Sequence, residues 1–191
     1  MVVLSDQEIS AGIVDSCRRG DRDGFRALYD AYKDRVYSIA LYFFHGDPTV
    51  AGDVTQQVFL KLMTTIGQFR GDAEFSTWLY RLAVNACMDV ARRRKSDDAF
   101  ASRSRHEVFA ADAGSQEDEL VRQELAGSVR AAVAALPPKL RIAMLLRYFD
   151  DLSYEQMSKA LGCSRGTVAS RLNRGHKMLA DRLRAVTAAK G

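Results

Sequence analysis

Residues 153–179 read SYEQMSKALGCSRGTVASRLNRGHKML, and this stretch predicts two helices joined by a tight turn. Ser153 is placed to cap the first helix, and Gln156, three residues later, is placed to hydrogen-bond back to the backbone of the cap. Gly162 suits the end of that helix, because glycine adopts the left-handed conformation of a C-terminal cap at little steric cost. Ser164 then suits the cap of the second helix. The expected turn is therefore Gly162 to Ser164.

The second helix of this stretch is expected to have an apolar face and a cationic face. At 100° per residue, one inward stripe contains Val168, Leu172, Leu179 and Leu183. The opposite face contains Ser170, Asn173, Arg174 and Lys177, with Arg165 and Arg171 on its flanks. Arginine, asparagine, lysine and serine are the side chains that contact base edges and phosphates in a major groove. The pattern indicates a DNA-binding helix-turn-helix, and an ordinary helical hairpin with a solvated basic face is the alternative.

Composition favours an all-α protein that is soluble and cytoplasmic. The 191 residues include only three prolines and show no strand-like alternation, and 47% hydrophobic content suffices for one core or two small ones. Cys17, Cys87 and Cys163 are far apart and lack metal-ligand spacing, so we expect neither disulfides nor a zinc site. Apolar runs are too short for membrane insertion, and the N-terminus is too short and acidic for a signal peptide.

Charge is distributed unevenly along the chain. Residues 125–191 contain 12 basic and four acidic side chains, whereas residues 96–124 contain three basic and eight acidic ones. The basic excess lies with the helix-turn-helix, which indicates a polyanionic partner for that segment. The acidic stretch is rich in small residues and is expected to be a flexible linker. His106-Glu107 begins like a zinc motif, but Ala110 replaces the second histidine, so we expect no metal and no other cofactor.

Two helical domains are expected on either side of this linker. Apolar residues at three- and four-residue steps predict helices over Asp23–Phe43, Thr49–Ile66 and Phe75–Lys95 in the first domain. The apolar stripe is Phe25, Leu28, Tyr29, Tyr32, Val36, Ile39 and Phe43 in the first of these helices, and Val50, Val54, Val58 and Leu62 in the second. In the second domain, Pro137 and Pro138 separate a helix over Leu125–Leu136 from one over Lys139–Phe149, which precedes the helix-turn-helix. The predicted lead-in over 1–20 has one or two helical turns around Asp6 to Arg18 and no assigned chemistry. The predicted domains are 21–95 and 125–185, with the linker over 96–124 and a tail over 186–191.

Two features of the third predicted helix each have a functional and a structural interpretation. Polar residues beside its apolar stripe are Arg81, Asn85, Asp89 and Arg92, and the nearby aromatic residues are Phe69, Phe75 and Trp78. Aromatic faces stack unpaired bases, so this combination suits a single strand, but an Arg81–Asp89 network with Trp78 as plain core is the alternative. The run Arg92–Lys95 suits phosphate contact or, equally, complements the helix macrodipole.

Four blocks in this order resemble the extracytoplasmic-function (ECF) sigma factors of bacterial RNA polymerase. They are GDRDGFRALYDAYKDRVYSIA, GDVTQQVFLKLM, FRGDAEFSTWLYRLAVNACMDVARRRK and LPPKLRIAMLLRYFDDLSYEQMSKALGCSRGTVASRLNRGHKML. The resemblance extends from Asp21 to Leu183. It implies that the first domain is sigma domain 2, a bundle of three or four helices, and that the second is sigma domain 4. The implied function is promoter-specific transcription initiation, with core RNA polymerase and promoter DNA as partners and an anti-sigma factor as a further one.

The resemblance also implies roles for individual residues. Core polymerase would be bound by Asp53, Gln56, Gln57 and Lys61. The minus-10 element would be bound by Phe69, Arg70, Phe75, Trp78, Arg81, Asn85, Arg92, Arg93, Arg94 and Lys95, with the loop Gln68–Glu74 capturing flipped bases. The minus-35 element would be bound by Tyr154, Glu155, Arg165, Ser170, Arg171 and Arg174, to which the cationic face of the second helix adds Asn173 and Lys177. Ala169 stands where many relatives have arginine, so their promoter sequence does not transfer.

Two other classes of function compete with this interpretation. A stand-alone helix-turn-helix regulator would bind two half-sites as a dimer, and the sequence shows no clear dimer seam. A recombinase-like enzyme would need a nucleophile or clustered metal-binding carboxylates, and Asp53, Asp72, Glu74 and Asp89 do not have that spacing. We therefore expect no catalytic residues and no small-molecule substrate.

The resemblance to ECF sigma factors also implies a path for the acidic linker, which is expected to run through the RNA-exit path of the polymerase.

Overall fold

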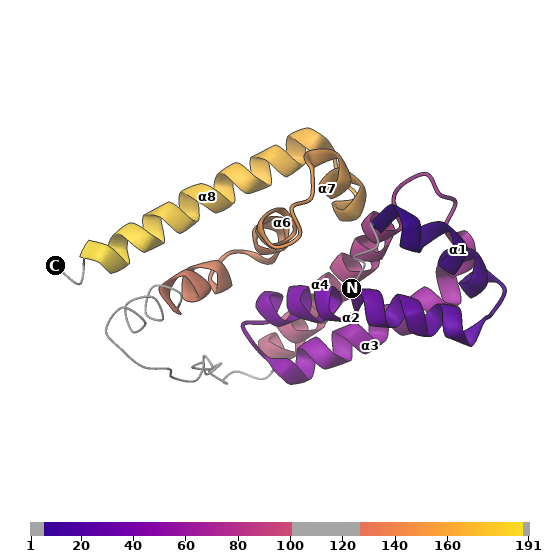
Figure 1. Cartoon of the computed structure of the whole chain (residues 1–191). Coiled ribbons are helices and arrows are strands. Elements are labelled where there is room, and N and C mark those ends of the chain that lie inside the picture. Colours follow the sequence, from indigo (N-terminus) through magenta and orange to yellow (C-terminus); the bar gives the residue numbers. More distant parts are fainter. Residues whose placement is uncertain (1–5, 101–126, 189–191) are drawn as a thin grey trace, which may run out of the picture.

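The computed structural model describes residues 6–100 and 127–188, and every regular element in these ranges is helical. The all-α prediction is therefore confirmed. The elements of Figure 1 are α1 (Asp6–Arg18), α2 (Arg22–Phe43), α3 (Pro48–Thr65), the short 3-10 helix η1 (Ile66–Gln68), α4 (Phe75–Phe100), α6 (Pro138–Tyr148), α7 (Tyr154–Leu161) and α8 (Arg165–Ala188), and residues 127–134 form a further helix. Helix α4 continues five residues past the expected start of the linker, and linker residues 101–124 lie outside the described ranges.

Helices α2, α3 and α4 pack around one apolar core in the first domain. The inward stripe expected for α3 is confirmed, since Val50, Val54, Val58 and Leu62 are all buried. In α2 the expected stripe is buried except at Phe25, which is half-buried, and at Tyr29, which is 44% exposed and packs edge-on against the ring of Phe59 at 4.8 Å. Tyr29 lies at the margin of the stripe, where helical spacing alone does not determine burial.

Aspartate caps set where α2 and α3 begin. Asp21 accepts a hydrogen bond from the amide of Asp23 at 3.0 Å, and Asp47 accepts one from the amide of Val50 at 3.0 Å. Pro48 occupies the first turn of α3, where its missing N–H leaves no partner unsatisfied. Gly46 has φ +86°, a conformation that glycine adopts without strain, so the chain turns sharply between α2 and α3.

The lead-in is more ordered than the sequence indicated, because α1 is a 13-residue helix packed on α2. Val14 and Cys17 are both 2% exposed and lie one turn apart on the face toward α2. Gly24 permits this contact, since a Cβ atom there would lie 2.9 Å from Cβ of Ser16. With so few apolar residues in α1, its periodicity was too weak to predict a docked helix.

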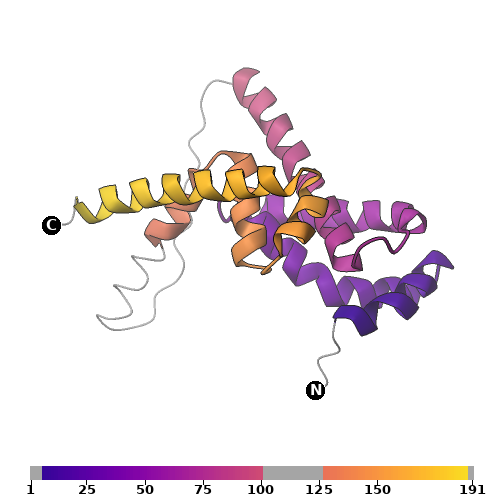
Figure 2. The ribbon, with the colours of Figure 1, turned by 90° about the horizontal axis from the view of Figure 1, so that it is seen from above.

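The second domain contains the predicted helix-turn-helix. Gln156 N–H donates to Ser153 Oγ at 3.2 Å, and Ser153 N–H donates to Gln156 Oε1 at 2.8 Å, which confirms the capping box. Gly162 has φ +59°, as expected of the left-handed cap, and Ser164 Oγ accepts from the amide of Thr167. Helix α8 runs to Ala188, three residues past the expected end of the domain, and its C-terminal end extends away from α1–α4 in both views (Figures 1 and 2).

The two domains pack directly against each other, α6 on α2 and α7 on α4. Arg141 of α6, 8% exposed, joins them: its Nη1 donates to the Phe43 carbonyl at 2.6 Å and lies 3.2 Å from His45 Nε2. Its Nη2 donates to the carbonyls of Leu136, at 2.8 Å, and Ala134. One guanidinium thus satisfies carbonyls at the end of α2 and in the turn before α6.

Replacing Arg141 should destabilise the whole chain. Arg141→Met keeps an apolar stem of similar length but leaves the buried carbonyls of Phe43 and Leu136 without a donor, so the free energy of unfolding should fall by about 3 kcal/mol. Urea unfolding followed by far-UV circular dichroism measures this change. Arg130→Met is the matched control, because Arg130 is exposed and its loss should change stability by no more than about 0.5 kcal/mol. Equal midpoints for the two variants would contradict the role given to Arg141.

Candidate nucleic-acid interface

Helix α8 presents the expected cationic face to solvent. Its inward side is anchored by Val168 and Leu172, which are buried, and by Leu179 and Leu183, which are half-buried. Gly175 is also buried and brings α8 against Met144 of α6, whose sulfur would lie 2.9 Å from an added Cβ. The face opposite is exposed at Ser170, Asn173, Arg174 and Lys177; Arg165 is exposed on one flank and Arg171 is half-buried on the other. A rigid helix therefore displays donors for a DNA groove.

The first turn of α7, a helix that packs against α8, carries two further residues of the expected DNA-binding surface. Tyr154 is 45% exposed, and Glu155 is exposed and paired with Lys159 at 3.6 Å. His176, which the sequence analysis did not single out, accepts or donates a 2.6 Å hydrogen bond with Tyr148 of α6. This bond links the surface of α8 to α6.

Three aromatic rings form a cluster where η1 leads into α4. The ring of Phe69 lies 5.5 Å from that of Phe75 and 5.6 Å from that of Trp78, and the last two are 5.8 Å apart. Phe69 and Trp78 are half-buried, but Phe75 is only 2% exposed and contacts Tyr32 in the core. The buried ring of Phe75 therefore packs against the rings of Phe69 and Trp78, and it offers no face for a base in this conformation.

Polar residues flank the aromatic cluster along α4. Arg70, Arg81 and Asn85 are exposed, and the described residues contain no ion pair between Arg81 and Asp89. Asp89 instead pairs with Arg92 at 3.0 Å, one turn further along the same helix. The strip beside Trp78 is thus accessible to a ligand.

The basic run Arg92–Lys95 of α4 contains exposed side chains and one side chain that is paired within the fold. Arg92, Arg93 and Lys95 are exposed, whereas Arg94 donates to Asp47 at 3.3 Å and lies over the Phe44 ring at 5.5 Å. Burial opposes ionisation of Asp47, but hydrogen bonds from the Val50 amide and Arg94 outweigh it and lower the pKa of this carboxyl. Because α4 continues to Phe100, the run does not lie in its last turn, so the helix-macrodipole explanation loses its basis.

Helix α3 carries a second exposed polar face. Asp53, Gln56, Gln57 and Lys61 are all exposed, as expected. Sequence reasoning missed that Leu60 and Met63 are also more than half exposed, beside a groove of about 500 Å³ between α2 and α3 that Tyr29 and Phe59 also line. Leu60 and Met63 fall outside the buried stripe of Val54, Val58 and Leu62. Apolar residues outside that stripe were the sequence signal that could have identified this surface. Exposed apolar residues ringed by polar ones are typical of protein-docking surfaces.

Contacts between the two domains surround a polar cavity of about 320 Å³, and none of them was predicted. Tyr80 of α4 donates to Asp150 Oδ1 at 2.8 Å, and Gln156 of α7 donates to Glu74 Oε2 at 2.9 Å. The other carboxylate oxygen of Asp150 is buried and has no hydrogen-bond partner among the described residues. Burial raises the pKa of Asp150, against the opposing effects of Tyr80 and Arg35, and the neighbouring Asp151 raises it further.

No helix in the described ranges has the length and hydrophobicity needed to cross a membrane. Nor do the described residues bring three or more potential metal ligands together.

Comparison with known proteins identifies relatives of both domains. The family model described as Sigma-70 region 2 matches residues 28–97, and the model described as Sigma-70, region 4 matches residues 126–179. The RNA polymerase sigma-H factor of Pseudomonas aeruginosa is 35% identical over 180 residues, covering 91% of this chain and 93% of the relative. The ECF RNA polymerase sigma factor SigW of Bacillus subtilis is 33% identical over 174 residues, covering 87% and 92%. The fold is similar to that of the sigma factor RpoE solved with the anti-sigma factor NepR from Bartonella quintana, with TM-score 0.65, 20% identity, and coverage of 84% of this chain and 96% of that one.

The buried carboxyl of Asp150 should make stability depend on pH. Since its pKa is raised on folding, its favourable contribution is complete below the pKa of the unfolded chain, about 3.9, and is lost as pH rises through the folded pKa. Asp150→Asn should therefore be more stable than the wild type at neutral pH, and the difference in unfolding free energy should shrink as pH falls toward about 4. Urea titrations at several pH values measure it.

Asp72→Asn serves as the control for this series, because Asp72 is an exposed carboxylate in the loop before α4. It should leave the pH dependence of the wild type unchanged. A difference between Asp150→Asn and the wild type that stays constant across the pH range would refute the assignment.

Proposed function

The chain belongs to the ECF sigma factors of the sigma-70 family, and from this premise we propose which of its surfaces meet the polymerase and which meet the promoter. The observation that carries the proposal is that relatives at least 30% identical match the chain through both domains. The protein would bind core RNA polymerase in the cytoplasm and direct it to promoters, with no reaction, cofactor or metal of its own. We further propose that the domains are 21–95 and 125–185, joined by the linker.

Helix α8 is proposed to read the minus-35 element. A helix displaying arginine, asparagine and serine on one exposed face fits the major groove, in which arginine recognises guanine and asparagine recognises adenine. The residues assigned to this surface are Tyr154, Glu155, Arg165, Ser170, Arg171, Asn173, Arg174 and Lys177. Their exposure in α7 and α8 supports the assignment, with Arg171 the least accessible of them.

The loop after η1 and the adjoining face of α4 are proposed to hold the unpaired strand of the minus-10 element. Phe69 and Trp78 offer partly exposed rings for stacking, while Arg70, Arg81 and Asn85 offer charge and hydrogen bonds. Arg92, Arg93 and Lys95 would contact the upstream phosphates. Phe75 and Arg94 take supporting roles in this proposal, because one is buried and the other is paired with Asp47.

Core polymerase is proposed to dock on α3, through Asp53, Gln56, Gln57 and Lys61 and the neighbouring Leu60 and Met63. Apolar side chains ringed by polar ones give a docking surface both affinity and specificity. An anti-sigma factor is a further proposed partner. The Bartonella quintana protein of similar fold was solved with one, and the groove between α2 and α3 is the candidate surface here.

The packed domains must separate for this function. The minus-35 and minus-10 elements lie about 25 base pairs apart, which is roughly 85 Å along B-DNA. In the packed chain, however, Glu74 of the minus-10 loop is hydrogen-bonded to Gln156 at the start of α7. Helix α8 is only about 36 Å long at 1.5 Å per residue, so it does not bridge that distance from its present position.

Transcription with purified components tests the proposal. Bacterial core polymerase is incubated with a pool of genomic promoter fragments, with and without the protein, and run-off transcripts are sequenced. We expect discrete transcripts only when the protein is present, and co-elution of the protein with core polymerase. Failure to bind core polymerase, combined with tight binding of the isolated chain to duplex DNA, would contradict the proposal and favour a stand-alone regulator.

Two arginine variants of α8 refine the same experiment. Arg174→Ala should lose about 1 to 3 kcal/mol of discrimination at one position of the minus-35 element. Arg184→Ala, which removes the same charge from an exposed position paired with Asp181, should leave that discrimination unchanged. An equal loss on all sequences would reduce Arg174 to a phosphate contact.

A further inference from the structure

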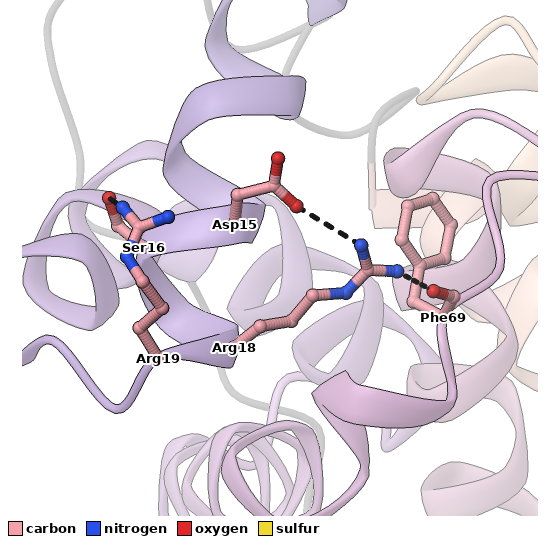
Figure 3. A network of polar contacts seen from close by, with 5 residues as sticks. All are labelled: Asp15, Ser16, Arg18, Arg19 and Phe69. Atoms are coloured by element: carbon pink, nitrogen blue, oxygen red, sulfur yellow. Dashed lines mark hydrogen bonds and ion pairs between the residues drawn. The ribbon is translucent and has the colours of Figure 1, made fainter.

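Arg18, the last residue of α1, reaches across to the loop that follows η1 (Figure 3). Its Nη2 donates a hydrogen bond to the backbone carbonyl of Phe69, 51 residues away in sequence, and its guanidinium lies 5.9 Å from the centroid of the Phe69 ring. Its Nη1 donates to Asp15 Oδ1 at 3.1 Å, which orients the planar group. One side chain therefore contacts both the backbone and the ring of the same phenylalanine.

Phe69 is where the chain leaves helical structure and enters the loop before α4. Its amide donates to the Ile66 carbonyl at 3.1 Å, its backbone is extended, and the chain turns at Gly71 with φ +80°. The ring then packs on Phe75 and Trp78. The direction in which the loop leaves η1, and the tilt of the ring, both depend on how this residue is held.

Helix α1 is rigid enough to act as the anchor for Arg18. Val14 and Cys17 are buried against α2, and Gly24 brings the two helices so close that a Cβ there would lie 3.2 Å from the Cys17 amide nitrogen. The adjacent Arg19 makes a different contact, donating to Ser16 Oγ of α1 at 3.0 Å (Figure 3). Two neighbouring arginines thus have the same charge and exposed setting, but only one touches the loop.

We propose that Arg18 is a positioning residue for recognition of the minus-10 strand, acting through the backbone and ring of Phe69. The inference rests on the proposed function of the loop. It extends that function to α1, which lies outside the segment that matches the region 2 family model. An exposed ion pair such as Arg18–Asp15 contributes little to stability. The role assigned to Arg18 is therefore to hold the backbone and ring of Phe69 in place.

Two readouts test this role, and the first needs no polymerase. Trp78 is the only tryptophan of the chain and contacts Phe69, so its fluorescence reports the aromatic cluster directly. In the free protein, Arg18→Ala should change the emission maximum and the acrylamide quenching of Trp78, while Arg19→Ala should match the wild type. Arg18→Lys should behave as an intermediate, because an ammonium lacks the fork that binds Asp15 and Phe69 together.

The second readout measures recognition of the strand. Holoenzyme is formed with core polymerase on a promoter whose minus-10 non-template strand carries 2-aminopurine, which brightens when its base leaves the stack. Arg18→Ala should reduce the rate of this signal roughly tenfold, as expected for a lost charge-assisted hydrogen bond. Arg19→Ala should stay within about twofold of the wild type, and both variants should bind core polymerase as the wild type does.

The possible outcomes distinguish the positioning role of Arg18 from the proposed function of the loop. Indistinguishable Trp78 fluorescence and 2-aminopurine rates in Arg18→Ala and Arg19→Ala would overturn the proposal. Loss of helicity or of core binding in Arg18→Ala would also overturn it, by showing a structural role. If Trp78 responds to Arg18→Ala while the wild type gives no promoter signal, the positioning of Phe69 is supported and the proposed function of the loop is rejected.

Discussion

The buried guanidinium of Arg141 is the contact on which the arrangement of the two domains depends. A cation removed from water needs hydrogen-bond acceptors, and the two Nη atoms of Arg141 find them in backbone carbonyls from the end of α2 and from the turn before α6. Its buried Nε has no partner among the described residues. Burial lowers the pKa of Arg141 to about 10, which leaves it protonated at neutral pH. Because the acceptors come from both domains, α6, the helix that precedes the helix-turn-helix, is held at the end of α2 in the first domain.

This constraint determines which functional surfaces are accessible and which are engaged. With α6 held on α2, α7 lies against α4. Gln156 then donates a hydrogen bond to Glu74, and Tyr80 donates one to Asp150. The cationic face of α8 and the polar face of α3 stay exposed, whereas the loop of the proposed minus-10 site lies beside the second domain. The contacts around the cavity between the domains are polar, and one carboxylate oxygen of Asp150 has no partner among the described residues. Such polar contacts are typical of an interface that separates more readily than a core.

Local features were predictable from the sequence, and features that depend on distant contacts were not. The capping box of Ser153, the left-handed Gly162 and the stripe of α3 follow from spacing within a few residues, so they were identified correctly. Periodicity does not reveal what covers a side chain, which is why Phe75 was expected to be available to a base although the core buries it. Arg141 and Arg18 escaped notice because their partners lie 98 and 51 residues away.

The central claim is that one chain holds its two DNA-reading domains together when free and separates them on a promoter. Spin labels at Arg26→Cys in α2 and Arg182→Cys in α8, both exposed sites, with Cys163→Ser removing the half-buried thiol, report the distance between the domains by double electron–electron resonance. We expect a single, narrow distance distribution in the free protein and an increase on the order of tens of ångströms in the promoter complex with core polymerase. The same distance in both states would contradict it.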